Sequence, residues 1–236
     1  MHLSSGLMVA LDMDDEDEAV QLAGEIGRDV AALKIGSQLF TRYGPELVRQ
    51  ITGSGGRVFL DLKYHDIPNT VAKAVLGAVQ TGVSWLTVHA SGGRAMIRAA
   101  KDAAGDARIL AVTVLTSLDK ETMGQIGWYG EVKDQVLRLA TLAREAGADG
   151  IVCSALEVRI LRSVLDDDCV LVTPGIRPLG SSRDDQARVA TPAGAVADGA
   201  DYLVVGRPIV KAPDRREAVR VILEQMKQGD ALREGA

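Results

Sequence analysis

Charged side chains recur at close spacing in one stretch of the chain. Asp61 and Lys63 are two residues apart, and Asp66 follows three residues later. In an extended strand, residues two apart point to the same face, so we expect Asp61 and Lys63 to face one way and Leu60 and Leu62 the other. A charged group inside a protein is costly unless it is paired. The spacing therefore predicts an internal lysine–aspartate pair, which suits a site that stabilises developing charge.

Ionisable residues also stand at the ends of other short apolar runs. Asp12 follows the run at 7–11, and Lys34 lies in the run at 32–35. If these runs are parallel strands of a barrel, their carboxyl ends converge on one mouth, where such folds place their chemistry. Two lysines and at least two aspartates converging in this way favour a reactive site. The alternative is a structural ion-pair network that closes the mouth.

A phosphate site is predicted near the end of the chain. Gly206 and Arg207 follow the last apolar run. In barrels, the loops after the seventh and eighth strands often bind phosphate through backbone N–H groups and a cation. An arginine can make a two-pronged contact to phosphate oxygens. The alternative is a surface arginine beside a glycine turn.

Other reactive residue types are not placed for the chemistry that they usually perform. His65 has no cysteine or second histidine at zinc-ligand spacing, and neither a metal site nor a cofactor is expected. Ser117 lacks the turn that presents a serine nucleophile, so acyl transfer is not expected. His89 closes an apolar run and is interpreted as a structural histidine.

Composition limits the partners. The formal net charge of −5 argues against nucleic acid, whose binding proteins usually carry a basic surface. No apolar run reaches the roughly 18 residues that span a membrane. The first six residues do not resemble a signal peptide. With Cys153 and Cys169 expected to be buried thiols, these features predict a cytoplasmic protein.

Short apolar runs alternate with helix-length amphipathic segments. The strands are expected at 7–11, 32–35, 57–62, 85–89, 109–115, 150–153, 169–173 and 202–205. The helices are expected at 14–26, 45–51, 71–80, 94–104, 132–146, 156–165, 192–198 and 215–227. The sequences Ala-Gly-Ala-Asp-Gly at 146–150 and Asp-Gly-Ala-Asp-Tyr at 198–202 predict a helix end, a tight turn and entry into a strand.

This alternation predicts a parallel sheet with right-handed connections. Eight such units in 236 residues favour an α/β fold with a single (β/α)8 TIM barrel that spans residues 1–236 as one domain. The alternative is an open, doubly wound sheet, but no Gly-x-Gly-x-x-Gly motif follows the first strand. Residues 228–236 are polar and are expected to fray.

The segment at 61–70, Asp-Leu-Lys-Tyr-His-Asp-Ile-Pro-Asn-Thr, resembles the signature of bacterial orotidine 5′-monophosphate decarboxylases. The similarity extends over nearly the whole chain, in matching order and spacing. It includes the segments at 10–12, 33–36, 87–90, 115–117, 172–177, 185–188 and 205–207. As a set, these motifs are far more specific than any one of them.

The resemblance implies a reaction without metal or cofactor. Lys34, Asp61, Lys63 and Asp66 correspond to the alternating charge array of that family, and Lys63 would protonate C6 of the pyrimidine. Asp61 would lie near the departing carboxylate, and Lys34 and Asp66 would hold the array. Neighbouring carboxylates favour the charged form of a lysine, and this cation would stabilise and quench the carbanion.

The resemblance also implies the substrate contacts, with orotidine 5′-monophosphate as substrate and uridine 5′-monophosphate as product. Asp12 and Lys34 would contact the ribose and Thr116 the base. Asp66 and Thr70 would reach into a neighbouring subunit, which implies a homodimer with shared sites. The phosphate would be held by Arg177, Gln186, Gly206 and Arg207, with Gln186 on a loop that closes over it. Further substrate contacts are expected at Ile67, Ser117 and Pro174.

Three alternatives to this function remain. Hexulose-phosphate synthases and ketogulonate-phosphate decarboxylases share an Asp-x-Lys-x-x-Asp segment but use Mg²⁺, and they typically place a glutamate where this chain has Lys34. A cation at that position would repel Mg²⁺. A non-catalytic barrel that binds a phosphate ligand would keep Gly206 and Arg207 but would not need the lysine–aspartate array. An inactive scaffold predicts that the charges do not converge.

Overall fold

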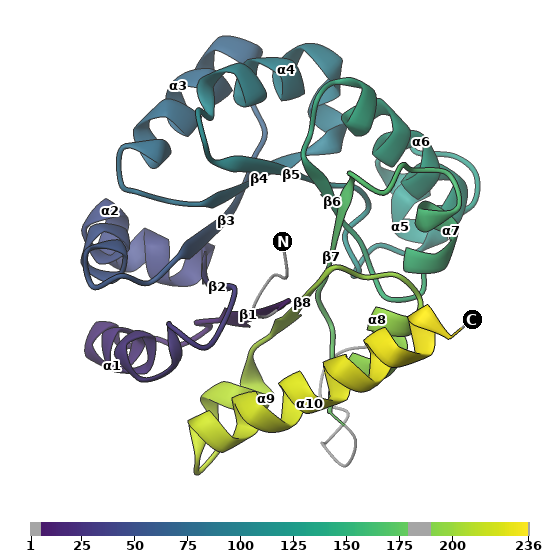
Figure 1. The fold of residues 1–236 in the computed structure, drawn as a ribbon. Helices are drawn as coiled ribbons and strands as arrows, with labels where there is room; N and C mark the ends of the chain where they lie inside the picture. Colours follow the sequence, from purple (N-terminus) through teal and green to yellow (C-terminus); the bar gives the residue numbers. More distant parts are fainter. Residues whose placement is uncertain (1–5, 179–189, 236) are drawn as a thin grey trace.

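The computed structural model describes residues 6–178 and 190–235. Its eight strands form a closed parallel barrel in sequence order, ringed by helices (Figure 1). The strands are β1 (Leu7–Ala10), β2 (Ala32–Gly36), β3 (Val58–Tyr64), β4 (Trp85–His89), β5 (Arg108–Val112), β6 (Gly150–Val152), β7 (Val170–Thr173) and β8 (Tyr202–Val205). The predicted TIM barrel is confirmed, and the open sheet is wrong because β1 pairs with β8, with Leu7 beside Leu203.

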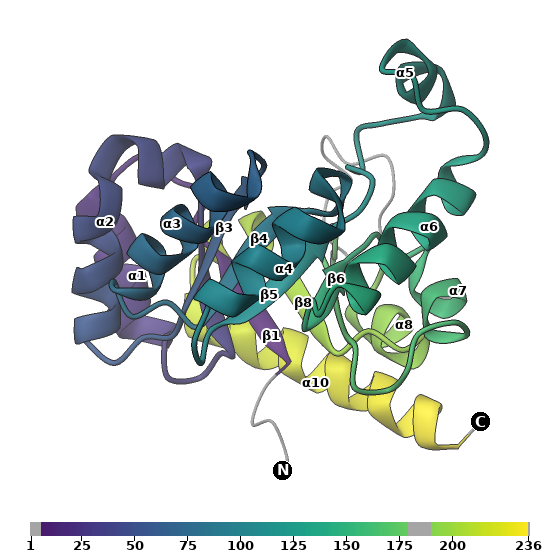
Figure 2. The same cartoon turned by 90° about the horizontal axis from the view of Figure 1, so that it is seen from above.

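The helices follow the strands in alternation. They are α1 (Glu16–Ile26), α2 (Ser37–Gly53), α3 (Pro68–Val79), the 3₁₀ turn η1 (Ala90–Gly92), α4 (Gly93–Ala103), α5 (Lys120–Gln125), α6 (Val132–Glu145), α7 (Val158–Arg162), α8 (Pro192–Ala197), α9 (Arg207–Val210) and α10 (Arg215–Glu234). Figure 2 shows α5 standing away from the barrel, on the segment between β5 and α6. Within the described ranges, no helix combines the length and apolar character needed to cross a membrane.

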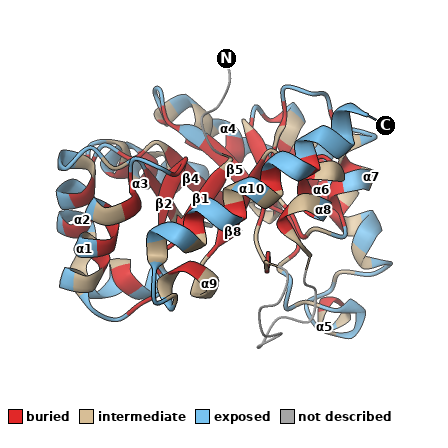
Figure 3. Ribbon diagram, turned by 60° about the horizontal axis from the view of Figure 1, so that its bottom comes forward, coloured by how far each residue is buried: buried red, intermediate tan, exposed pale blue. Residues whose placement is uncertain are grey.

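Two sets of apolar side chains hold the barrel together. One set packs between the outer face of the strands and the helices, so that the buried residues form a continuous layer under an exposed outer surface (Figure 3). The other set fills the barrel interior. There the rings of Trp85 and Tyr202 meet edge to face with centroids 5.0 Å apart, and the Arg108 guanidinium lies over Trp85. These three residues begin their strands, so they close the amino-terminal end and leave the other end for a cavity.

The two predicted Gly-Ala-Asp turns are confirmed. Gly147 and Gly199 adopt φ of 95° and 111°, a left-handed conformation that favours glycine. The aspartate that follows each turn binds a neighbouring strand: Asp149 accepts the N–H of Ile109, and Asp201 accepts that of Leu171, each at 2.8 Å. The turns therefore fix where β6 and β8 begin.

Some helix boundaries differ from the predictions. The helix expected at 45–51 is the second half of α2, which kinks at Gly44, where φ is 63°, just before Pro45. The expectation that residues 228–236 fray is wrong for most of that range, because α10 continues to Glu234. Tertiary contacts account for this extension: Gly229 lies directly against α8, and Arg233 approaches Asp201 at 3.9 Å.

Candidate active site

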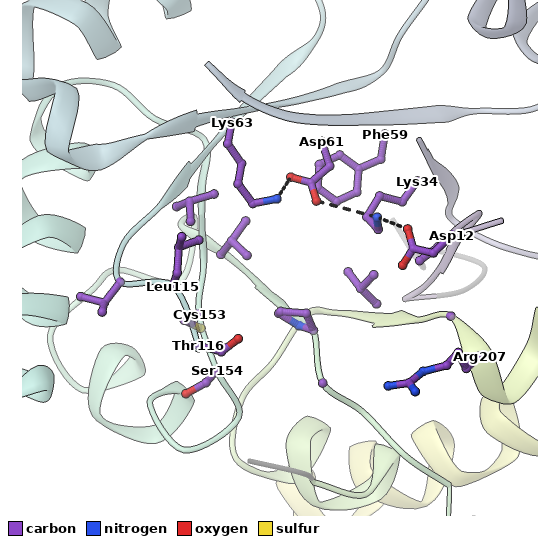
Figure 4. Close-up of a pocket in the computed structure, with 18 of the residues that line it drawn as sticks. Asp12, Lys34, Phe59, Asp61, Lys63, Leu115, Thr116, Cys153, Ser154 and Arg207 are labelled. Carbon is purple, nitrogen blue, oxygen red and sulfur yellow. Dashed lines mark hydrogen bonds and ion pairs between the residues drawn. The ribbon is translucent and has the colours of Figure 1, made fainter. Parts of the chain in front are cut away.

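A cavity of about 330 Å³ opens at the carboxyl ends of the strands (Figure 4). This volume is within the usual range for small-molecule sites. Many of the predicted site residues line it: Asp12, Lys34, Asp61, Lys63, Thr116, Pro174, Arg177, Gly206 and Arg207. The charges predicted from separate strands therefore converge.

Four charged side chains form a row along one side of the cavity. Lys34 Nζ lies 2.9 Å from Asp12 Oδ1 and 3.8 Å from Asp61 Oδ2. Lys63 Nζ donates to Asp61 Oδ1 at 2.9 Å. The order is Asp12, Lys34, Asp61, Lys63, with the signs alternating (Figure 4). Each inner member has opposite charges on both sides, which offsets the cost of its burial.

Strand register produces this row. Lys34 lies beside Ala10 of β1 and Phe59 of β3, so its side chain enters the barrel between Asp12 and Asp61. The side chain is only 11% exposed. A Cβ added at Gly36 would lie 3.2 Å from Lys34 Nζ, so the glycine leaves room for the ammonium group.

The backbone at Lys63 departs from a regular strand. Pairing between β3 and β4 shifts register between Leu60 and Tyr64. Lys63 has φ of 51° and is the only non-glycine residue with positive φ in the parts of the chain that the structure describes. The alternation of side chains along a strand predicts that Asp61 and Lys63 lie on the same side of β3. The local irregularity at Lys63 determines how their charged groups meet.

Arg207 lies across the cavity from Lys63 (Figure 4). It is the first residue of α9, and Gly206 precedes it. A Cβ at Gly206 would lie 3.3 Å from the Ala10 Cβ, so the loop after β8 passes close to β1. Arg177 enters from the loop after β7 and is 8% exposed. The cavity thus has a row of alternating charges on one side and two arginines from the β7 and β8 loops.

Other predicted residues lie elsewhere. Asp66 and Ile67 border a separate shallow depression beside Ser91. The Asp66 carboxylate accepts the Ile67 N–H at 2.6 Å. Thr70 and Ser117 do not line the cavity either. Within the described part of this chain, the charge row therefore lacks Asp66. The predicted phosphate contact Gln186 lies outside the described residues.

Sequence reasoning missed the residues that follow β6. Cys153 and Ser154 line the cavity near Thr116 (Figure 4). Ser154 is buried, and its backbone N–H donates to Glu157 Oε2 at 2.8 Å. Their position could have identified them, because both residues stand at the carboxyl end of a predicted strand. They carry no charge, so a search for ionisable residues passes over them.

His89 lies beside the charge row and packs against His65, with ring centroids 5.5 Å apart. Its burial lowers its pKa, and the nearby His65 and Lys63 lower it further, while Asp61 opposes them. The neutral ring is thus favoured next to the lysine. The interpretation of His89 as a structural residue stays a prediction.

Comparisons with known proteins agree with the geometry. The sequence model of the orotidine 5′-phosphate decarboxylase / HUMPS family matches residues 5–222. The chain is 49% identical to the orotidine 5′-phosphate decarboxylase of Nitrosococcus oceani over 222 residues, covering 92% of this chain and 96% of that protein. It is 45% identical to that of Heliobacterium modesticaldum, covering 99% and 100% of the two chains.

A solved structure extends the likeness to three dimensions. The crystal structure of orotidine 5′-phosphate decarboxylase from Lactobacillus acidophilus superposes with a TM-score of 0.84 at 38% identity, covering 93% of this chain and 98% of that one. Sequence and fold therefore agree over almost the full length. This chain belongs to the orotidine 5′-phosphate decarboxylase / HUMPS family.

Proposed function

We propose that this chain converts orotidine 5′-monophosphate to uridine 5′-monophosphate and CO₂, a step of pyrimidine biosynthesis. The observation that carries the proposal is the row Asp12, Lys34, Asp61, Lys63 in a cavity that also contains Arg207. The relatives from Nitrosococcus oceani, similar in sequence, and Lactobacillus acidophilus, similar in sequence and fold, are named for the same activity.

Lys63 acts as the proton donor in this proposal. When the C6–carboxylate bond breaks, CO₂ leaves and the electron pair stays on C6, where the ring cannot delocalise it as an enolate. Lys63 Nζ then transfers a proton to C6, and the resulting amine regains a proton from solvent. Before that transfer, the ammonium group stabilises the negative charge that develops on C6. Because it is already in position, it does not have to rearrange at the moment of reaction. Asp61, 2.9 Å from Lys63 Nζ, holds the ammonium in place and lies near the departing carboxylate.

The rest of the cavity binds the nucleotide. Asp12 and Lys34 contact the ribose hydroxyls, and Thr116 contacts the base. Arg177, Gly206 and Arg207 hold the phosphate, and Gln186 stays a predicted phosphate contact. Binding energy from the phosphate, remote from C6, is then available to orient the reacting carbon.

The geometry disfavours the Mg²⁺-dependent alternative. A divalent cation would need oxygen ligands, but the Lys34 ammonium occupies the space between Asp12 and Asp61. A metal bound there would have to displace a buried cation from both carboxylates. The residues present therefore do not fit Mg²⁺, and no step of the proposed mechanism uses it. A non-catalytic barrel that only binds phosphate would not need the row of Asp12, Lys34, Asp61 and Lys63.

We also infer that the chain, as one barrel domain, works as a homodimer with shared sites. Asp66 and Thr70 lie outside the cavity of their own chain. Beside them, Ile67 is 66% exposed, and a contact with a second copy would cover this apolar side chain. The cytoplasmic location stays a prediction.

The test follows the absorbance of orotidine 5′-monophosphate in the presence of EDTA. We expect turnover by the wild-type protein that is unaffected by the chelator and is lost in Lys63→Ala. Lys133→Ala, which changes an exposed lysine of α6, serves as the matched control and should retain activity. Absence of wild-type turnover would overturn the proposed reaction, and loss of turnover with EDTA would favour the metal-dependent alternative.

A further inference from the structure

Thr87 connects two members of the charge row without lining the cavity. It lies in the middle of β4 and is 1% exposed. Its Oγ1 accepts the backbone N–H of Lys63 at 2.9 Å. The same hydroxyl donates to Asp61 Oδ1 at 3.0 Å. A single buried hydroxyl therefore acts as acceptor for one residue of the pair and as donor for the other.

The irregularity in β3 explains why this hydroxyl is needed. Leu60 pairs with Leu86, and the next pair is Tyr64 with Val88. Four steps along β3 thus correspond to two along β4, and the segment from Asp61 to Lys63 cannot follow the regular ladder. A buried backbone N–H that leaves a ladder needs another partner. Thr87 supplies that partner for Lys63.

The conformation of Lys63 adds a second reason. A φ of 51° is unfavourable for a residue with a side chain, and such conformations persist where the surroundings hold them. The bond from the Lys63 N–H to Thr87 is one such restraint. It fixes the direction in which the lysine side chain leaves the backbone.

The Asp61 carboxylate is restrained by the same group. Asp61 Oδ1 accepts from both Thr87 Oγ1, at 3.0 Å, and Lys63 Nζ, at 2.9 Å. The other oxygen, Oδ2, faces Lys34 Nζ at 3.8 Å. The hydroxyl thereby sets which carboxylate oxygen faces which lysine, and so fixes the rotation of Asp61.

We propose that Thr87 is a positioning residue that sets the geometry of the Lys63–Asp61 pair for proton transfer. The inference rests on the proposed decarboxylation. Thr87 is not among the residues that line the cavity, so it acts through Lys63 and Asp61. Its loss should misplace the proton donor while leaving the phosphate and ribose contacts in place.

Three variants separate this role from simple packing. Thr87→Val keeps the shape but removes the hydroxyl, and Thr87→Ser keeps the hydroxyl but removes the methyl group. Thr113→Val is the matched control, because Thr113 is equally buried at 1% exposure and its hydroxyl donates to the Val152 carbonyl at 3.5 Å, outside the charge row. Each protein is measured for kcat and KM with orotidine 5′-monophosphate, for uridine 5′-monophosphate binding by calorimetry, and for Tm.

We expect kcat of Thr87→Val to fall by about 10- to 100-fold, because displacements of about 1 Å cost rates of that order. KM and product affinity should stay within about twofold of wild type, the pattern of an interaction that matters only in the transition state. Thr87→Ser should keep most of kcat, and Thr113→Val should keep kcat whatever its Tm.

Wild-type kcat in Thr87→Val would overturn the inference. So would an equal fall of kcat in Thr113→Val, or a Thr87→Ser protein as slow as Thr87→Val although both fold. If Thr87→Val does not fold, Thr87→Ala replaces it, with the same expectations. Failure of the proposed function looks different, because the wild-type protein itself would then show no turnover.

Discussion

At the scale of single residues, the site depends on how each charge is neutralised by its neighbours. Lys34 lies between two carboxylates, and Asp61 lies between two ammonium groups. Removing Lys34 or Asp61 would leave a neighbouring buried charge with fewer opposite charges. The resulting loss of stability exceeds the net stabilisation that the intact ion pair provides. His89 sits beside this row with a ring whose neutral form is favoured, so it adds no further positive charge next to Lys63.

The lowered pKa of His89 makes a prediction about pH. In the folded protein, the pKa of His89 is lowered by burial and by the nearby His65 and Lys63. A histidine in the unfolded chain has a pKa of about 6.5. The free energy of unfolding that the neutral His89 ring contributes is therefore fully present above about pH 6.5. It is lost as the pH falls, because the unfolded chain then binds a proton that the folded chain binds less readily. We expect the fall in Tm between about pH 7 and about pH 5 to be smaller in His89→Gln than in wild type. Thermal unfolding at both pH values measures this, and an identical fall in both proteins would contradict it.

At the scale of elements, close approach between α8 and α10 fastens the end of the chain to the barrel. A Cβ at Gly229 of α10 would lie 2.5 Å from the Ala193 carbonyl oxygen and 2.8 Å from the Val196 Cβ. The glycine therefore allows the two helices to touch through backbone atoms. By contrast, Gly24 of α1 has no atom within 4 Å of the same built position. Both glycines are helical, so they differ in packing rather than in conformation.

This contrast makes a paired prediction. Gly24→Ala should raise stability by about 0.5–1 kcal/mol, because alanine is the better helix former. Gly229→Ala should lower it by about 1–3 kcal/mol, because the added methyl forces the helices apart. Chemical denaturation of both variants and the wild type measures whether the free energy of unfolding rises in Gly24→Ala and falls in Gly229→Ala. A stabilised Gly229→Ala protein would show that α10 can move away from α8 at little cost.

At the scale of the whole molecule, closure of the barrel brings together residues from both ends of the chain. Asp12 follows β1 and Arg207 follows β8, yet both line one cavity because these strands pair. Asp66 and Thr70 remain outside that cavity. In the proposed homodimer, these residues complete the site of the second copy, so an active centre would contain parts of two barrels.

Mixing inactive variants tests this arrangement. Asp66→Ala and Lys63→Ala proteins, each inactive alone, should recover part of the activity when they are unfolded together and refolded. Random pairing puts about half of the chains into hybrid dimers, and each hybrid carries one intact site, so recovery of roughly a quarter of wild-type activity is expected if pairing is unbiased. A mixture of Lys63→Ala and Lys34→Ala proteins is the control and should recover none, because both residues serve the site of their own chain. No recovery in the first mixture would contradict shared sites.

The sequence by itself determined the order of elements and most of the cavity. Alternating apolar runs and amphipathic segments predicted all eight strands, because hydrophobic periodicity is local. The positions of Asp12, Lys34, Asp61, Lys63 and Arg207 at the ends of those runs then predicted that they would meet. Parallel strands in a barrel present their carboxyl ends on one side, so knowing the fold class was enough to place these residues together.

The tertiary structure alone decided the features that depend on contacts between elements. The register shift in β3, the positive φ of Lys63 and its bond to Thr87 follow from how β3 meets β4. Ser154 enters the cavity without any charge to mark it. The extension of α10 to Glu234 follows from its approach to α8. In each case the physical reason is the same: backbone pairing and close packing join residues far apart in sequence, and no local pattern of residue types encodes those distances.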